Sequence, residues 1–253
     1  MNPAYMATFI VGDIHGYVEP LVDLLAQLRS KIATDDTVVF LGDYIDRGPA
    51  TKQCIDALLS FEQEVKGRVE FLCGNHEDWL LRTMSDYRRH SWLLGMEAWD
   101  TISSYAPQST ETLQAALNNA GPAVFERCRL PYECFFDQMP EAHLAFFNRL
   151  KLFSQTADCT CAHAGVPDKP EPFDGHDRAP FIWGTHRFPE SYSGIRTVVY
   201  GHWNNAVIRS DDPPSPKIVG DTIGIDTIAH GVLTAVEMPS RVIFRSGHVV
   251  ARF

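Results

Sequence analysis

Three short apolar runs in the first third of the chain are each followed by a polar, glycine-containing loop and then by a helical pattern. The runs predict strands because they are rich in β-branched and aromatic residues, and they comprise Thr8–Val11, Thr37–Leu41 and Val69–Cys73. Leucine and isoleucine then recur at helical spacing in Tyr17–Lys31 and Thr51–Phe61, and a third helix is expected to begin near His76. This repeated unit predicts an α/β fold in which helices cover a largely parallel sheet.

The pattern changes after the third unit. Residues 85–153 consist of helical segments separated by prolines, which we interpret as a helical insertion within a single domain spanning residues 1–253. Two further strand-like runs, Cys159–Ala162 and Thr197–Tyr200, come after it. The last part of the chain contains shorter β runs separated by turn residues, which predict antiparallel hairpins: Lys217–Val219, Ile223–Ile225, Val232–Val236 and Val242–Phe244.

Charge and composition exclude several classes of partner. The 253-residue chain has 32 acidic and 22 basic residues, giving a net charge of −10. The protein's negative electrostatic field would therefore repel nucleic acid and anionic membranes and disfavour nonspecific binding to them. No apolar run approaches the ~20 residues that span a bilayer, and no Lys or Arg precedes Arg29 as it would in a signal peptide. With only six cysteines, we expect a soluble cytoplasmic protein, and the sequence leaves its oligomeric state open.

Side chains that bind metals occur at all three strand–helix junctions. The junctions read Gly12-Asp13-Ile14-His15-Gly16, Gly42-Asp43-Tyr44-Ile45-Asp46-Arg47-Gly48-Pro49 and Gly74-Asn75-His76-Glu77. Because such junctions lie together at the carboxyl edge of a wound sheet, their side chains are expected to converge. Asp13 and His15 are two residues apart, so in an extended segment both project from one side and can reach one cation.

Two more histidines follow strand-like runs, His163 in His163-Ala164-Gly165 and His202 in Gly201-His202-Trp203. The predicted ligand set is therefore Asp13, His15, Asp43, Asn75, His163 and His202. Carboxylate and imidazole ligands suit Mn²⁺, Fe²⁺ or Zn²⁺, and we interpret Cys159 and Cys161 as core thiols. Six side chains suit two ions bridged by one carboxylate, about 3.5 to 4 Å apart, which would polarise a bridging water into hydroxide.

These motifs, in this order, resemble the phosphoprotein phosphatase branch of the calcineurin-like metallophosphoesterases in its bacterial form. The matching pieces run from Gly12 to His202, and Ile225-Asp226-Thr227 resembles a further family segment. The resemblance implies a four-layer α/β/β/α sandwich with the metals at the edge of two central sheets. It also implies a division of the ligands: Asp13 and His15 on the first metal, Asp43 as the bridge, and Asn75, His163 and His202 on the second.

The resemblance also implies roles around the metals. His76 would be the general acid that protonates the leaving oxygen, and Asp46 would orient its imidazole. Arg47 would hold two phosphate oxygens in its planar fork, supplying positive charge that the acidic chain otherwise lacks. Family members often carry a second phosphate-binding arginine where this chain has Thr185, and Arg187 would take its place from a shifted position.

Other differences from the protein phosphatase motifs suggest an alternative activity. The chain continues with Trp203-Asn204 after Gly201-His202, which is similar to the symmetrical dinucleoside tetraphosphatases of the same superfamily, and Ile228 stands where a glycine usually follows Asp-Thr. The leading interpretation is a manganese-dependent hydrolase of the serine/threonine protein phosphatase type, acting on phosphorylated proteins, peptides or small phosphoesters. The alternative is a hydrolase of diadenosine tetraphosphate that stacks a base on Trp203, Trp183 or Trp92.

A catalytically silent binder of phosphorylated ligands is a third interpretation. The presence of both His76 and Asp46 argues against it, because a binding module has no use for a proton donor. A nuclease is disfavoured by the net charge.

Overall fold

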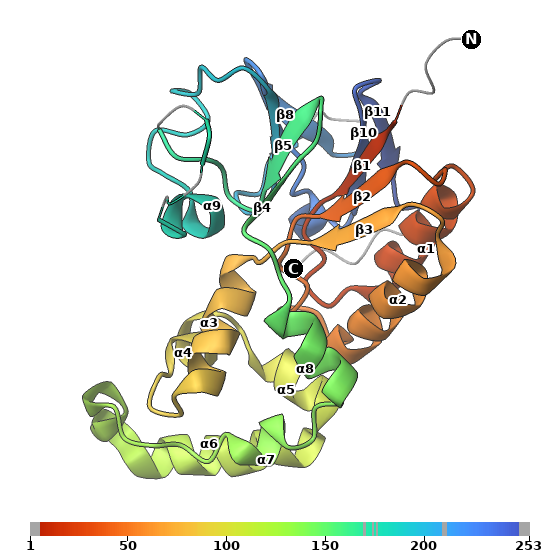
Figure 1. Cartoon of the computed structure of the whole chain (residues 1–253). Coiled ribbons are helices and arrows are strands. Elements are labelled where there is room, and N and C mark those ends of the chain that lie inside the picture. Colours follow the sequence, from red (N-terminus) through yellow and green to blue (C-terminus); the bar gives the residue numbers. More distant parts are fainter. Residues whose placement is uncertain (1–5, 169–170, 174, 176, 209–211, 248–253) are drawn as a thin grey trace.

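Two β-sheets and their surrounding helices make up this computed structural model, which describes residues 6–168, 171–173, 175, 177–208 and 212–247 (Figure 1). The first sheet has the strand order β11-β10-β1-β2-β3, and the second has the order β4-β5-β6-β9-β8-β7. The expected α/β fold with layered sheets and helices is confirmed. Among the described residues, no helix is both long and apolar enough to cross a membrane.

The first sheet begins with the repeated unit that the sequence predicts. Strands β1 (Thr8–Val11), β2 (Thr37–Phe40) and β3 (Arg68–Phe71) are parallel, and helices α1 (Val18–Arg29) and α2 (Thr51–Glu64) connect them. The hairpin of β10 (Thr234–Met238) and β11 (Val242–Arg245) extends the sheet, with β10 antiparallel to β1. The sheet is therefore mixed and not largely parallel, because the C-terminal hairpin returns to pair with the first strand.

The second sheet is also mixed. Strands β5 (Cys159–Ala162), β6 (Thr197–Tyr200) and β9 (Thr222–Gly224) are parallel to one another. The antiparallel members are β4 (Phe153–Gln155), β7 (Ala206–Val207) and β8 (Ser215–Val219). The hairpins that the sequence predicts in the last part of the chain do form, but they are divided between the sheets, β8–β9 in the second and β10–β11 in the first.

A buried apolar layer joins the two sheets. Alternate residues of the strands face each other across it, including Ile10 and Val39 from the first sheet and Val199 from the second. Cys159 and Cys161 lie fully buried in the same layer, as expected of core thiols. The opposite face of the first sheet packs on α1 and α2, and α9 (Ala179–Trp183) contributes to a separate cluster on β5 and β6. Burial of both faces explains why the strands read as near-continuous apolar runs.

Helices fill the interval between β3 and β4. They are α3 (Asn75–Ser85), α4 (Ser91–Gly95), α5 (Trp99–Tyr105), α6 (Pro107–Ala120), the 3₁₀ helix η1 (Gly121–Glu126), α7 (Glu133–Phe136) and α8 (Glu141–Asn148). Figure 1 shows this run, in yellow and green, on one side of the sheets. A second 3₁₀ helix, η2 (Ile228–His230), follows β9.

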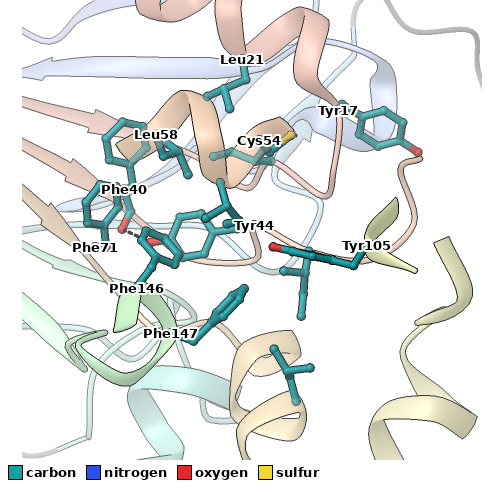
Figure 2. Close-up of a cluster of buried hydrophobic side chains, with 14 of the residues drawn as sticks. Tyr17, Leu21, Phe40, Tyr44, Cys54, Leu58, Phe71, Tyr105, Phe146 and Phe147 are labelled. Carbon is teal, nitrogen blue, oxygen red and sulfur yellow. Dashed lines mark hydrogen bonds between the residues drawn. The ribbon is translucent and has the colours of Figure 1, made fainter. Parts of the chain in front are cut away.

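Tyr44 anchors the loop between β2 and α2 to the core (Figure 2). Its ring is fully buried, with its centroid 5.2 Å from that of Phe146 and 6.2 Å from that of Phe71. Its hydroxyl donates a hydrogen bond to the Leu72 carbonyl at 2.8 Å. The only polar atom of the buried side chain therefore has a hydrogen-bond partner. The loop residues on either side of Tyr44 are therefore held in fixed positions at the edge of the sheet.

Candidate metal centre

The structure brings together the six side chains that the sequence predicts as ligands. They follow five strands: Asp13 and His15 follow β1, Asp43 follows β2, Asn75 follows β3, His163 follows β5 and His202 follows β6. All are buried except His202, which is partly exposed. Since these strands belong to both sheets, the cluster lies where the carboxyl ends of the parallel strands of the two sheets meet.

Asn75, His163 and His202 form the tighter half of the cluster. Asn75 Oδ1 lies 2.9 Å from His163 Nε2 and 2.8 Å from His202 Nδ1, and these two nitrogens are 3.2 Å apart. Asp43 Oδ2 lies 3.4 Å from His163 Nε2 and 3.6 Å from His15 Nε2. Asp43 thus stands between two groups of ligand atoms, as a carboxylate shared by two ions must.

Backbone carbonyls determine which nitrogen of two histidines faces the cluster. Nδ1 of His15 lies 3.1 Å from the Ile45 carbonyl oxygen, and Nδ1 of His163 lies 3.1 Å from that of Leu41. A carbonyl oxygen can only accept, so each Nδ1 carries the proton and each Nε2 presents a lone pair. Burial lowers the pKa of both imidazoles, which favours the neutral form that a metal ligand requires.

Burial and neighbouring groups shift the pKa values of three of the clustered side chains. Burial and the neighbouring His163 lower the pKa of His202 to about 3. Burial opposes ionisation of Asp43, but the surrounding imidazoles, His163 foremost, hold its pKa below the usual value. Burial and then the Asp226 and Asp43 carboxylates raise the pKa of Asp13 well above its usual value.

Two carboxylate oxygens at this site are buried without a hydrogen-bond partner. Among the described residues, Oδ1 of Asp13 and Oδ1 of Asp226 are buried and accept no hydrogen bond. A Cβ atom at position 201 would collide with Asp13 Oδ1, so Gly201 leaves room for that oxygen. Orphaned acidic oxygens beside neutral imidazoles and an amide fit a divalent ion such as Mn²⁺, Fe²⁺ or Zn²⁺. Asp226 lies in the Ile225-Asp226-Thr227 segment, which resembles the family, but the sequence alone indicates no role for it.

The loops that carry these side chains have strained backbones. Six non-glycine residues in them adopt positive φ: His15 (49°), Asp43 (49°), Asp46 (69°), Arg47 (67°), His202 (69°) and Asn204 (47°). Non-glycine residues rarely adopt this left-handed backbone conformation, and those that do are concentrated at functional sites.

Glu77 holds two of the loops together. Its fully buried carboxylate accepts hydrogen bonds from the backbone amides of Asp43, Tyr44 and Gly74 at 2.9 to 3.0 Å. The β2–α2 junction is thereby fixed to the start of α3. Glu77 belongs to the Gly74–Glu77 motif, but the sequence alone indicates no role for it, because the three amides come from two separate junctions.

His76 and Asp46 form a buried pair beside the cluster. His76 Nδ1 lies 2.7 Å from Asp46 Oδ2, and His76 Nε2 lies 3.9 Å from Asp43 Oδ2. Burial alone would lower the pKa of His76, but the Asp43 carboxylate and the hydrogen bond to Asp46 raise it. The imidazole can therefore hold a proton on the nitrogen that faces Asp43.

Trp92 and Thr101, from the helices between β3 and β4, complete the surroundings of Asp46. The Trp92 indole N–H donates to Asp46 Oδ2 at 3.0 Å, and the Thr101 hydroxyl donates to Asp46 Oδ1 at 2.7 Å. Trp92 is fully buried. The expectation that Trp92 could stack a substrate base is therefore wrong, because its ring is enclosed in the core and its one polar atom is already used.

The two arginines predicted to bind phosphate differ in position. Arg47 Nη1 lies 2.9 Å from His15 Nε2, and Arg47 Nε lies 3.7 Å from Glu97 Oε1. Its side chain is 41% exposed, so it extends from the cluster into solvent. Arg187 is exposed and makes no side-chain hydrogen bond or ion pair with any described residue. Of these two arginines, Arg47 alone has a recorded contact with one of the six clustered side chains among the described residues.

Two tryptophans line the exposed side of His202. The Trp203 ring centroid lies 4.3 Å from that of His202, and Trp203 is 49% exposed. The Trp183 ring is 6.5 Å from His202 and only partly buried. A cavity of about 340 Å³ opens beside Trp203 and Asn204.

Comparisons with known proteins identify relatives. The family model described as calcineurin-like phosphoesterase matches residues 6–206. A symmetrical bis(5'-nucleosyl)-tetraphosphatase from Klebsiella pneumoniae is 32% identical over 85 residues, which is 34% of this chain and 28% of that protein. One from Actinobacillus pleuropneumoniae is 37% identical over 79 residues, or 31% of this chain and 27% of that one. The matched stretch thus spans little more than a quarter of these relatives.

Solved structures share the fold at low identity. A cold-active protein-tyrosine phosphatase from a Shewanella species superposes with a TM-score of 0.57 and 13% identity, covering 96% of this chain and 78% of that one. A metallophosphoesterase from Sphaerobacter thermophilus gives a TM-score of 0.51 and 14% identity, covering 98% and 90%.

Proposed function

Because the chain belongs to the calcineurin-like phosphoesterase family, we propose that it is a phosphoester hydrolase that binds two divalent ions through the six clustered side chains. Asp13 and His15 would hold the first ion, Asn75, His163 and His202 would hold the second, and Asp43 would be shared between them. The observation that supports this most is the position of Asp43, within 3.4 to 3.6 Å of histidine nitrogens on both sides. Two divalent ions held by these residues would supply an activated water as the nucleophile and positive charge for the phosphate.

The remaining steps use the chain's own residues. Arg47 holds phosphate oxygens in its guanidinium fork next to His15, where its side chain already points. His76 donates the proton that the leaving oxygen requires, and the hydrogen bond from His76 Nδ1 to Asp46 keeps Nε2 facing the reacting group. A merely binding protein would not need this buried acid, so the pair favours catalysis over silent phosphoester binding.

The helices between β3 and β4 belong to this same unit in our proposal. Trp92 and Thr101, which both lie in the 85–153 interval, hydrogen-bond to Asp46 inside the site. An insertion that supplies these contacts is part of one domain with the sheets.

For the substrate we propose a phosphomonoester of the serine/threonine protein phosphatase type. The His76–Asp46 pair supports this choice, because alkoxide leaving groups such as serine need protonation more than acidic ones do. Symmetrical diadenosine tetraphosphate is the second candidate, favoured by the half-exposed Trp203 beside His202, which offers a stacking surface for a base.

Initial rates distinguish the two candidates. We expect purified protein with Mn²⁺ to hydrolyse a phosphoserine peptide with a higher kcat/KM than a phosphotyrosine peptide or diadenosine tetraphosphate. A preference for the dinucleotide would establish the second candidate. Absence of turnover on all three substrates with Mn²⁺, Fe²⁺ and Zn²⁺ would overturn the proposal of hydrolysis.

A further inference from the structure

A second cavity, of about 400 Å³, lies between the end of α3, helix α4 and η1. We call it the arginine pocket, because four arginines and no acidic residue are among its lining residues: Arg82, Arg88, Arg89 and Arg127. In a chain of net charge −10, this concentration of cations creates a local positive field. None of the six clustered side chains lines the pocket.

Ion pairing neutralises only part of this charge. Arg82 Nη2 lies 2.8 Å from Asp78 Oδ2, and Arg88 Nε lies 2.9 Å from Asp86 Oδ1. Arg89 Nε lies 3.9 Å from the other oxygen of Asp86, so two arginines share that one carboxylate. Both acids lie outside the lining and hold the guanidinium groups in place. Arg127 forms no ion pair with any described residue. The Thr83 hydroxyl donates to the Arg89 carbonyl at 2.9 Å, which fixes the backbone of one wall.

Aromatic rings share the pocket with the arginines. Phe125 is 81% exposed, which is unusual for so large an apolar side chain, and Trp79 lies partly buried opposite α4. Arginines bind phosphate oxygens in charge-assisted pairs, and flat rings stack on bases. A compact cavity of this volume suits one small molecule better than an extended peptide. Phosphate groups joined to a base satisfy both features.

The arginine pocket adjoins the candidate metal centre through two tryptophans. The Trp79 ring centroid lies 4.9 Å from that of Trp183, and the Trp183 ring lies 6.5 Å from that of His202. Helix α3 begins at Asn75 in the centre and reaches Arg82 about 10 Å further along, at 1.5 Å per residue.

We infer that the arginine pocket binds a nucleoside phosphate, with its phosphates on the arginines and its base on Phe125 or Trp79. The same chemistry has two sources, a free nucleotide or the far end of a nucleotide-bearing substrate of the proposed hydrolase. Binding of the far end of a substrate rests on the proposed hydrolase function, whereas binding of a free nucleotide does not.

Binding without turnover tests the pocket by itself. Isothermal titration calorimetry in EDTA compares ATP, tripolyphosphate and adenosine, so no hydrolysis interferes. We expect ATP to bind the wild-type chain and to bind Arg88→Ala/Arg127→Ala at least tenfold more weakly, because two charge-assisted contacts are lost. The matched control is Arg29→Ala, which removes an exposed, ion-paired arginine of α1 and should leave ATP binding unchanged.

A separate variant tests the role of the exposed Phe125 ring in binding the base. Phe125→Ala removes an exposed ring without touching the charges, so we expect it to weaken ATP about fivefold while tripolyphosphate binding stays unchanged. Equal ATP affinity in the wild type and both variants would overturn the inference, as would binding of an acidic peptide but not of ATP. Tripolyphosphate binding as tight as that of ATP, with no effect of Phe125→Ala, would refute the nucleoside part.

A kinetic comparison shows whether the pocket binds a free nucleotide or the far end of a substrate. If KM for diadenosine tetraphosphate rises in Arg88→Ala/Arg127→Ala, the pocket holds the far end of a substrate. If KM is unchanged, or that compound is not turned over while ATP binding is lost in the variant, the pocket takes a free nucleotide. Both results support a nucleoside phosphate site.

Discussion

The His76 imidazole donates a 2.7 Å hydrogen bond from Nδ1 to the Asp46 carboxylate, and both side chains are almost fully buried. The opposite nitrogen of His76 faces Asp43, at 3.9 Å from Oδ2. His76 is thus close enough to Asp43 to be either a proton donor or a further metal ligand. Experiments that separate metal content from leaving-group dependence decide between these roles.

The His76→Asn variant should retain two bound ions and lose kcat. General acid catalysis contributes about 10² to 10⁴-fold, so a loss of that size is expected for a phosphoserine peptide. An aryl phosphate needs less protonation and should lose less. Asp46→Asn should give a milder form of the same pattern, because the imidazole remains in place. Equal losses for both substrates, or loss of metal on elemental analysis, would show that His76 is a ligand or a structural residue.

Thr101→Val should reduce both stability and kcat. The Thr101 hydroxyl donates to Asp46 Oδ1 at 2.7 Å and accepts from the Asp46 amide at 2.8 Å. Valine therefore leaves the buried Asp46 amide without an acceptor, and Asp46 Oδ1 keeps only the Trp92 indole N–H at 3.2 Å. We expect a cost of about 1 to 3 kcal/mol in the free energy of unfolding, measured by urea denaturation. The matched control is Thr110→Val, since Thr110 Oγ1 has no hydrogen-bond partner among the described residues. If Thr110→Val destabilises the protein as much, the account of Thr101 is wrong.

Divalent ions should stabilise the folded chain. At a concentration 100 times the dissociation constant, a ligand adds about 2.7 kcal/mol, which corresponds to roughly 5 to 10 °C in Tm for a chain of this size. Mn²⁺ added to EDTA-treated protein should produce this shift in scanning fluorimetry. Asp43→Asn should abolish it, whereas Asp35→Asn, in an exposed loop, should not. An unchanged response in Asp43→Asn would remove Asp43 from the bridging position.

Asp226→Asn should affect metal-free and metal-loaded protein in opposite directions. Asp226 raises the pKa of Asp13, so the two buried carboxylates repel each other, and the amide removes this repulsion while keeping an acceptor for the Asn204 amide. The metal-free Tm should rise. Loss of a negative charge should also weaken Mn²⁺ binding, roughly tenfold. A Tm shift with Mn²⁺ as large as that of the wild type would show that Asp226 does not act on the ions.

The sequence determined the repeated βα unit and the residues at its junctions. The apolar periodicity of the first 75 residues places strands and helices, and the rule that parallel strands present their junctions at one edge is enough to bring Asp13, Asp43 and Asn75 together. The sequence also places Cys159 and Cys161 within one short strand-like run, where a thiol behaves as a small core hydrophobe.

Only the tertiary structure decided how the two sheets share their hairpins and which distant groups complete the site. The pairing of β10 with β1, and the contacts of Trp92 with Asp46 and of Glu77 with the Asp43 amide, join residues 34 or more positions apart. Such contacts depend on how whole elements pack, and no local periodicity encodes them. For the same reason the sequence could suggest Trp92 as an exposed stacking residue, whereas packing buried it against Asp46.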